Sequence, residues 1–208
     1  MQQTQQTQST PILSIIGAKI ALGPRCRELI PLAARWYNDF EIMRTYGNQF
    51  RLSTLERFEE MYARNSSGGT DFVDFAIYEQ ATLRLIGQCG LEQINHFDRT
   101  AKYTILIGEK DCWNRGFGTE TTQLVLDYGF TCLGLHNLYL TVYSFNQRGL
   151  NAYRRAGFKE IGRQREACRL GGKAHDVIYM DCLATEFQSP VLANLLVGDE
   201  EGGHNHHG

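Results

Sequence analysis

The stretch WNRGFGTET at residues 113–121 constrains this chain most, because it sets two glycines between an apolar run, TILIG, and a helix-forming run, TETTQLVLDYGFTCLG. A strand, a glycine turn and a helix N-terminus together form an anion site, since unpaired backbone N–H groups and the helix dipole both favour negative charge. Gly116 and Gly118 let the backbone approach a ligand closely, and Arg115 carries a full charge. The turn predicts a phosphate or pyrophosphate ligand.

Two nucleotide-binding motifs do not match this turn. It lacks the lysine-serine/threonine ending of a P-loop and the third glycine of the dinucleotide fingerprint. For a lone pair of glycines, a simple turn of the chain is the commoner explanation. A second motif, later in the chain, favours a binding loop over a simple turn.

The apolar periodicity of the whole chain predicts an α/β fold of about seven strands and about four helices. The order is β-α-α-β-β-β-α-β-α-β-β, which indicates a mixed, mostly antiparallel twisted sheet. Serine and glutamate at the start of the second helix form a capping box. The expected strands are 12–22, 71–80, 82–94, 101–108, 137–144, 161–170 and 174–183, and the expected helices are 26–39, 53–65, 119–134 and 146–157.

Length and composition fit one domain with a sizeable core, since the 208 residues are 42% hydrophobic and 21% charged. The formal net charge of −2 argues against nucleic acid as the main partner. No apolar run reaches the roughly 18 residues of a membrane span. The six cysteines form no C-x-x-C pair, which favours reduced thiols in a cytoplasmic protein and no zinc site.

Both ends of the chain are polar and read as tails. We expect a disordered tail at 1–10, one domain at 11–187 and a flexible C-terminal tail at 188–208. His204, His206 and His207 raise the question of metal binding, but a solvated tail is the better explanation.

The second motif lies in NQRGLNAYRRAGF and, with the glycine turn, resembles the GNAT superfamily of acyl-CoA-dependent N-acetyltransferases over residues 12–183. The family's loop is R/Q-x-x-G-x-G/A, and Trp113 stands here in place of the arginine or glutamine. Tryptophan at this position is similar to the branch of ribosomal-protein alanine N-acetyltransferases and spermidine N-acetyltransferases. The second motif matches at Asn146, Gly149, Tyr153, Arg155, Gly157 and Phe158.

The resemblance implies a single GNAT-type domain with a splay in the middle of the sheet and acetyl-CoA as cosubstrate, without a metal. The loop amides would hold the pyrophosphate, the strand before the loop would pair with the pantetheine arm, and Asn146 would contact that arm. The expected binding residues in the strand are Ile105, Leu106 and Ile107, and those in the loop are Trp113, Asn114, Arg115, Gly116, Phe117, Gly118 and Thr119.

The resemblance also implies direct attack by an amine on the thioester, with Tyr153 protonating the departing thiolate and a backbone N–H near Ile107 stabilising the oxyanion. A core tyrosine is the alternative for Tyr153 taken alone. Glu92 is the candidate base if it faces the splay, otherwise it is a solvated strand charge. His96 is a weaker candidate for the base or the substrate rim. A covalent acyl-cysteine at Cys89 or Cys112 is disfavoured, because no His and Asp motif accompanies them.

The acceptor is left open between a protein N-terminal α-amine and a polyamine or antibiotic amine. Asp39, Glu41, Glu59 and Glu60 could attract a cation or be ordinary solvated charges. A non-catalytic acyl-CoA sensor is the alternative function, which the intact Tyr153 disfavours. A nucleotide-binding protein is a third. The hairpin 161–183 is a plausible homodimer surface.

Overall fold

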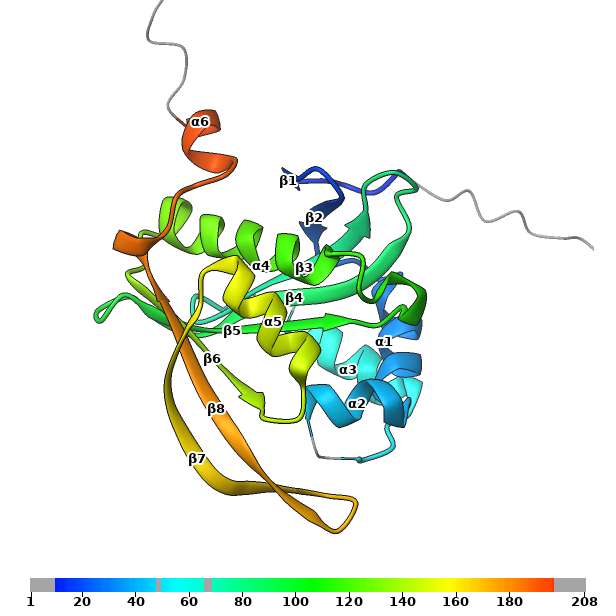
Figure 1. The fold of residues 1–208 in the computed structure, drawn as a ribbon. Coiled ribbons are helices and arrows are strands. Elements are labelled where there is room, and N and C mark those ends of the chain that lie inside the picture. Colours follow the sequence, from blue (N-terminus) through cyan, green and yellow to red (C-terminus); the bar gives the residue numbers. More distant parts are fainter. Residues whose placement is uncertain (1–9, 48–49, 66–68, 197–208) are drawn as a thin grey trace, which may run out of the picture.

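The computed structural model describes residues 10–47, 50–65 and 69–196 (Figure 1). Its centre is one twisted sheet with the strand order β1-β2-β3-β4-β5-β6-β8-β7. Every neighbouring pair is antiparallel except β5 and β6. The mixed, mostly antiparallel sheet is therefore confirmed. The strands are β1 (Ile15–Ile16), β2 (Ile20–Pro24), β3 (Val73–Glu79), β4 (Leu85–Asn95), β5 (Thr100–Ile107), β6 (Asn137–Tyr143), β7 (Lys159–Leu170) and β8 (Lys173–Leu183).

The sheet has one strand more than expected, because the run 12–22 is not continuous. A tight turn at Gly17, whose N–H donates to the Ile20 carbonyl at 2.9 Å, divides it into β1 and β2. The closing hairpin agrees with the prediction. Gly171 and Gly172, at φ 57° and 78°, form its turn in the left-handed conformation that glycine tolerates.

Helices cover both faces of the sheet, with α4 and α5 on one face and α1, α2 and α3 on the other (Figure 1). The helix α2 was not expected. Asp39 ends the preceding helical run and caps α2, since its Oδ1 accepts from the N–H of Glu41 at 2.9 Å. The helices are α1 (Leu29–Tyr37), α2 (Phe40–Tyr46), α3 (Leu55–Asn65), α4 (Phe117–Asp127), α5 (Gln147–Ala156) and α6 (Leu192–Leu196), with a π-helical turn at Tyr128–Cys132.

The splay expected in the sheet lies between β5 and β6. Their parallel pairing covers only Thr100–Lys102 on β5 and ends at Lys102 opposite Tyr139. Beyond this point β5 stays paired with β4 as far as Ile107, while β6 stays paired with β8 as far as Tyr143. The two strands diverge, and each presents an unpaired backbone edge to the gap.

Side chains of β5 alternate between the two layers of the molecule. Tyr103, Ile105 and Ile107 pack in the core with α4, whereas Leu106 packs against Trp36 of α1. The splay therefore opens toward the α4–α5 layer and toward the α1–α2 layer. This arrangement makes one gap reachable from both faces of the sheet.

The segment after β8 is packed against the domain as far as α6, which differs from the flexible tail expected from residue 188. The buried Asp127 at the end of α4 accepts hydrogen bonds from the N–H groups of Val191 and Leu192, at 3.0 and 2.9 Å. Its other carboxylate oxygen accepts from Thr131 Oγ1 at 2.8 Å. The packed region therefore extends beyond the expected domain boundary at residue 187. The reason is that Asp127, far away in sequence, accepts from the first N–H groups of α6.

Across the described ranges, no helix is long and apolar enough to cross a membrane. Within those same residues, no three His, Cys, Asp or Glu side chains gather as metal ligands. All six cysteines are free thiols. The histidines at 204, 206 and 207 lie outside the described residues.

Candidate active site

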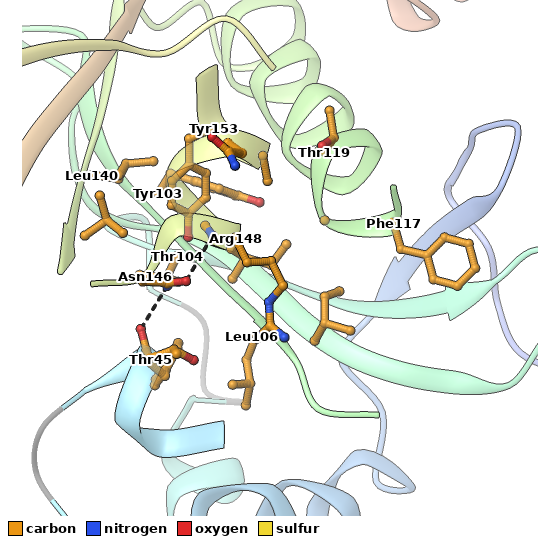
Figure 2. A pocket seen from close by; sticks show the side chains of 18 of the residues that line it. Thr45, Tyr103, Thr104, Leu106, Phe117, Thr119, Leu140, Asn146, Arg148 and Tyr153 are labelled. Carbon is orange, nitrogen blue, oxygen red and sulfur yellow. Dashed lines mark hydrogen bonds between the residues drawn. The ribbon is translucent and has the colours of Figure 1, made fainter. Parts of the chain in front are cut away.

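A cleft of about 500 Å³ occupies the splay and draws its walls from α2, β5, the 112–119 loop, β6 and α5 (Figure 2). It contains every residue expected in the site except Arg115. Glu92 of β4 and its cross-strand partner Lys102 of β5 both line it. The structure thus brings together segments that are far apart in sequence.

The glycine turn forms a cradle of bare backbone. Asn114 and Gly116 adopt left-handed conformations, at φ 60° and 86°, which curl the loop before α4 begins. The N–H groups of the first turn, from Phe117 to Thr119, precede the first hydrogen bonds of the helix. A Cβ built on Gly118 would meet no atom within 4 Å, so this glycine faces open space in the cleft. The loop fits a pyrophosphate held by backbone amides.

The free edge of β5 also fits an extended ligand arm. The N–H of Gly108 donates to the Ile86 carbonyl of β4 at 2.9 Å, and the backbone groups of successive strand residues point to opposite edges. Ile105 and Ile107 therefore direct their N–H groups toward the cleft. An N–H at Ile107 is correctly placed to donate to an oxyanion or to a ligand carbonyl in the splay.

Trp113 fastens the loop to the end of β5. Its indole Nε1 donates to the Ile107 carbonyl at 2.9 Å. The guanidinium of Arg148 lies 3.6 Å from the centre of its ring, a cation–π contact. The tryptophan found in place of the usual arginine or glutamine thus joins β5, the loop and α5.

Arg115 lies in the loop, but its guanidinium is directed away from the cleft. It forms an ion pair with the nearly buried Glu79 of β3, with an N–O distance of 2.7 Å, and stacks on the ring of Phe117 at 4.5 Å. Its charge anchors the loop to β3. The guanidinium does not line the cleft in this structure, and its contact with the phosphates stays a prediction.

Arg148 is the cation that sequence reasoning missed. It stands in the first turn of α5 and extends into the cleft toward Leu106 (Figure 2). Burial lowers its pKa, so its charge is held in a partly dry environment. A cation at a helix N-terminus opposes the dipole, and this unfavourable placement was the available signal that an anion belongs nearby.

Asn146 caps α5 and closes one side of the cleft. Its Oδ1 accepts from the N–H of Gly149 at 3.0 Å, and its Nδ2 donates to the Thr45 carbonyl of α2 at 3.4 Å (Figure 2). A Cβ on residue 149 would come within 2.7 Å of that amide, which explains the glycine there. The side chain lines the cleft while its polar atoms tie α5 to α2.

Tyr153 projects from α5 into the cleft among aromatic rings (Figure 2). Its ring centre lies 6.3 Å from that of Tyr103 and 6.1 Å from that of Phe158, both edge to face. Burial raises the pKa of Tyr153 to about 12, and the charge of Arg148 acts in the opposite direction. The phenol is therefore protonated at neutral pH.

Glu92 faces the cleft rather than bulk solvent. It pairs in register with Lys102 of β5, and both side chains line the cavity. The next residue, Gln93, has φ 54° in a bulge of β4 and accepts from the Tyr139 hydroxyl at 2.9 Å outside the cleft. The bulge follows Glu92 and leaves it on the α1–α2 face with Gln88.

A pair of tyrosines on that face was not found from sequence. Tyr46, at the end of α2, lines the cleft, and Tyr37 accepts from Gln88 Nε2 at 2.9 Å. Their rings meet edge to face at 5.5 Å. Burial raises the pKa of Tyr46, and the charge of Glu92 adds to that rise. Glu92 therefore sits within electrostatic reach of both phenols.

Several weaker candidates lie outside the cleft. His96 is in an exposed turn, where its Nε2 meets the Thr70 carbonyl at 3.0 Å. Asp39 and Glu41 both pair with Lys110, at 2.7 Å each. Glu59 and Glu60, considered as groups that attract a cationic acceptor, are exposed on α3.

The two cysteines considered as nucleophiles are both buried, and Cys112 lines the cleft. Burial raises the pKa of Cys89 and of Cys112, which keeps both thiols protonated. A protonated, desolvated thiol is a poor nucleophile. This favours structural roles for both.

Comparison with known proteins agrees with this geometry. A family model described as an acetyltransferase (GNAT) domain matches residues 23–159. The spermidine N(1)-acetyltransferase of Escherichia coli (strain K12) is 32% identical over 132 residues, covering 60% of this chain and 68% of the relative. Its namesake from Vibrio cholerae serotype O1 is 30% identical over 134 residues, covering 64% and 76%.

A solved structure gives the same result at the level of the fold. The spermidine N-acetyltransferase from Vibrio cholerae in complex with CoA and spermine superposes with a TM-score of 0.74 and 26% identity. The match covers 82% of this chain and 98% of that one.

Proposed function

The chain belongs to the GNAT acetyltransferase family, and from that premise we propose that it acetylates a primary amine of a polyamine through groups lining the splay. The protein is an acetyl-CoA-dependent N-acetyltransferase. The polyamine acceptor is supported by the spermidine acetyltransferases that it resembles. The observation that carries the proposal is the cleft itself, which contains Tyr153, Glu92 and the loop amides together.

The two substrates enter from opposite faces of the sheet. The loop and the first turn of α4 hold the pyrophosphate on the α4–α5 side, and Arg148 carries a cation in the same cleft, against the Trp113 ring. The amine enters from the α1–α2 side, between Glu92 and Tyr46. Acetyl-CoA, when bound, supplies the thioester carbonyl that the amine attacks.

Glu92 and Tyr153 handle the protons of the reaction. Glu92 accepts a proton from the ammonium form of the acceptor, because only the neutral amine has a free electron pair. The N–H of Ile107 donates a hydrogen bond to the carbonyl oxygen as it gains charge. Tyr153 donates its proton toward the departing sulfur, and Arg148 beside it lowers the cost of that donation.

A thiol-release assay on four variants tests these roles. We expect Glu92→Gln and Tyr153→Phe each to lower kcat/KM for spermidine by about 100-fold, the usual contribution of a general acid or base. Matched controls are Glu59→Gln on the exposed surface of α3 and Tyr179→Phe on β8, where the tyrosine is 39% exposed. Both controls should keep wild-type activity.

The acceptor is tested in the same assay with spermidine, an aminoglycoside and peptides that start with alanine or serine. Turnover confined to peptides would identify a protein N-terminus, rather than a polyamine, as the acceptor. Calorimetric binding of acetyl-CoA without turnover of any amine would favour the acyl-CoA sensor. Full activity in Tyr153→Phe would remove the phenol from the mechanism.

Two further expectations stay predictions. The strand β7 forms an open edge of the sheet, and the hairpin that contains it remains the surface predicted for a homodimer. A cytoplasmic location stays a prediction from the cysteine pattern.

A further inference from the structure

Tyr103 occupies the point at which the sheet opens. It is the first residue of β5 beyond the last parallel pair with β6, Lys102 opposite Tyr139. Its side chain is only 3% exposed, yet it lines the cleft. The contacts of Tyr103 therefore link its neighbours to the position where the two strands diverge.

The ring of Tyr103 holds the ring of Tyr153. The two centres are 6.3 Å apart at 88°, an edge-to-face contact. Phe158, just after α5, stacks on Tyr103 at 6.0 Å and meets Tyr153 at 6.1 Å. These three rings pack pairwise, so the direction of the Tyr153 phenol depends on the ring at position 103.

The hydroxyl of Tyr103 reaches the loop helix through one threonine. It lies 3.0 Å from Oγ1 of Thr122 on α4, which is fully buried. That Oγ1 donates to the Gly118 carbonyl at 2.7 Å. A hydroxyl has a single proton to donate, so Tyr103 must be the donor to Thr122. The chain of hydrogen bonds thus runs in one direction, from β5 to the first turn of α4.

We propose that Tyr103 is a positioning residue that couples the coenzyme loop to Tyr153 across the splay. Its hydroxyl fixes the first turn of α4 through Thr122, and its ring fixes the phenol on α5. The coupling to the chemical step rests on the role proposed above for Tyr153. The coupling to the loop does not depend on that role.

Two substitutions at this residue separate the two halves of the coupling. Tyr103→Phe keeps the ring and removes the hydroxyl, so we expect KM for acetyl-CoA to rise about threefold to tenfold with kcat nearly unchanged, the range for one neutral hydrogen bond. Tyr103→Leu removes the ring, and kcat should fall about tenfold or more because the acid is misplaced. Thr122→Val should repeat the Phe phenotype, whereas Thr122→Ser should restore wild-type values.

A double-mutant cycle distinguishes failure of the coupling from failure of Tyr153 itself. In a Tyr153→Phe background there is no phenol to position, so Tyr103→Leu should lower kcat by less than about twofold further. Additive losses would overturn the coupling. A Tyr153→Phe enzyme with full kcat would instead overturn the general acid and leave the KM effects of Tyr103→Phe and Thr122→Val to be judged alone.

Thermal unfolding serves as the structural control. If Tyr103→Leu does not fold, Tyr103→Met takes its place, since methionine fills irregular space without a ring. Equal falls in kcat for the Phe and the Leu or Met variants, with KM unchanged, would contradict the proposal, because ring and hydroxyl would not then act separately.

Discussion

In the proposed mechanism, the buried Tyr153 has to remain protonated and still be able to donate to the departing sulfur. Burial raises the pKa of Tyr153 to about 12, whereas a thiolate leaving group has a pKa of about 8.5. Full proton transfer between these two groups is uphill, which makes the neighbouring Arg148 important. Its charge lowers the phenol pKa, and its own pKa is lowered by the same burial. The proposed proton donation by Tyr153 therefore depends on Arg148 as well.

The raised pKa of Tyr153 makes a prediction about stability at high pH. The folded pKa of about 12 exceeds the ordinary value of 10.0, so the contribution to stability is complete below pH 10 and is lost as the pH rises toward 12. Over that window the wild type should lose about 2 to 3 kcal/mol of unfolding free energy relative to Tyr153→Phe. Urea titrations of both proteins at about pH 8 and about pH 11.5 measure the difference. Equal losses of unfolding free energy in the wild type and in Tyr153→Phe would contradict the burial of this phenol.

At the scale of elements, helix ends decide the geometry of this domain. The loop before α4 leaves its first amides free for a ligand, and Asn146 caps α5 beside the same cleft. At the other end of α4, Asp127 holds the π-helical turn and the first amides of α6 with one carboxylate. One helix thus offers free amides at its N-terminus, where we propose that the coenzyme binds, and secures the C-terminal segment at its other end.

Asp127→Asn should release α6 while leaving the active site intact. Both carboxylate oxygens of Asp127 accept hydrogen bonds, one from Thr131 and the other from the N–H groups of Val191 and Leu192. The asparagine side chain has only one accepting oxygen, so at least one of these donors loses its partner. We expect a loss of about 1 to 3 kcal/mol and faster exchange of those two amide protons. Hydrogen exchange followed by mass spectrometry measures this, with the exposed Asp71→Asn as the control. Unchanged protection of residues 190–196 would show that α6 is held by other contacts.

At the scale of the whole molecule, the proposed mechanism uses the splay to bring two substrates together from opposite faces of one sheet. The helices α4 and α5 cover one face of the sheet and α1 and α2 cover the other (Figure 1), and residues of α2, α4 and α5 line the same cleft. Burial keeps the thiols of Cys89 and Cys112 protonated, which disfavours an acetylated enzyme. Direct transfer then requires both substrates to be bound at once.

Initial-rate kinetics test the requirement for a ternary complex. Double-reciprocal plots against acetyl-CoA at several spermidine concentrations should intersect, because neither substrate can react alone. Intact mass spectrometry after incubation with acetyl-CoA alone should show no covalent acetyl group. Parallel lines, or an acetylated protein, would indicate a covalent intermediate and contradict direct transfer.

Much of this protein can be predicted from sequence because the responsible physics is local. Glycines at 116, 157, 171 and 172 adopt left-handed conformations that other residues resist, and they mark the loop, the end of α5 and the hairpin turn. Apolar periods set the order of strands and helices, and the two motifs place Tyr153 and the loop amides in one cleft. These features depend on neighbours within a few residues.

What only the tertiary structure decided is the partner that each side chain meets. Arg115 pairs with Glu79 while Arg148 enters the cleft, and no local pattern distinguishes the two arginines. In-register pairing with Lys102 places Glu92 on the α1–α2 face, and Tyr103 contacts both Thr122 and Tyr153 where the sheet opens. Register and packing set these contacts between distant segments. A single sequence specifies them only through the complete fold, because their energies depend on three-dimensional proximity rather than on spacing along the chain.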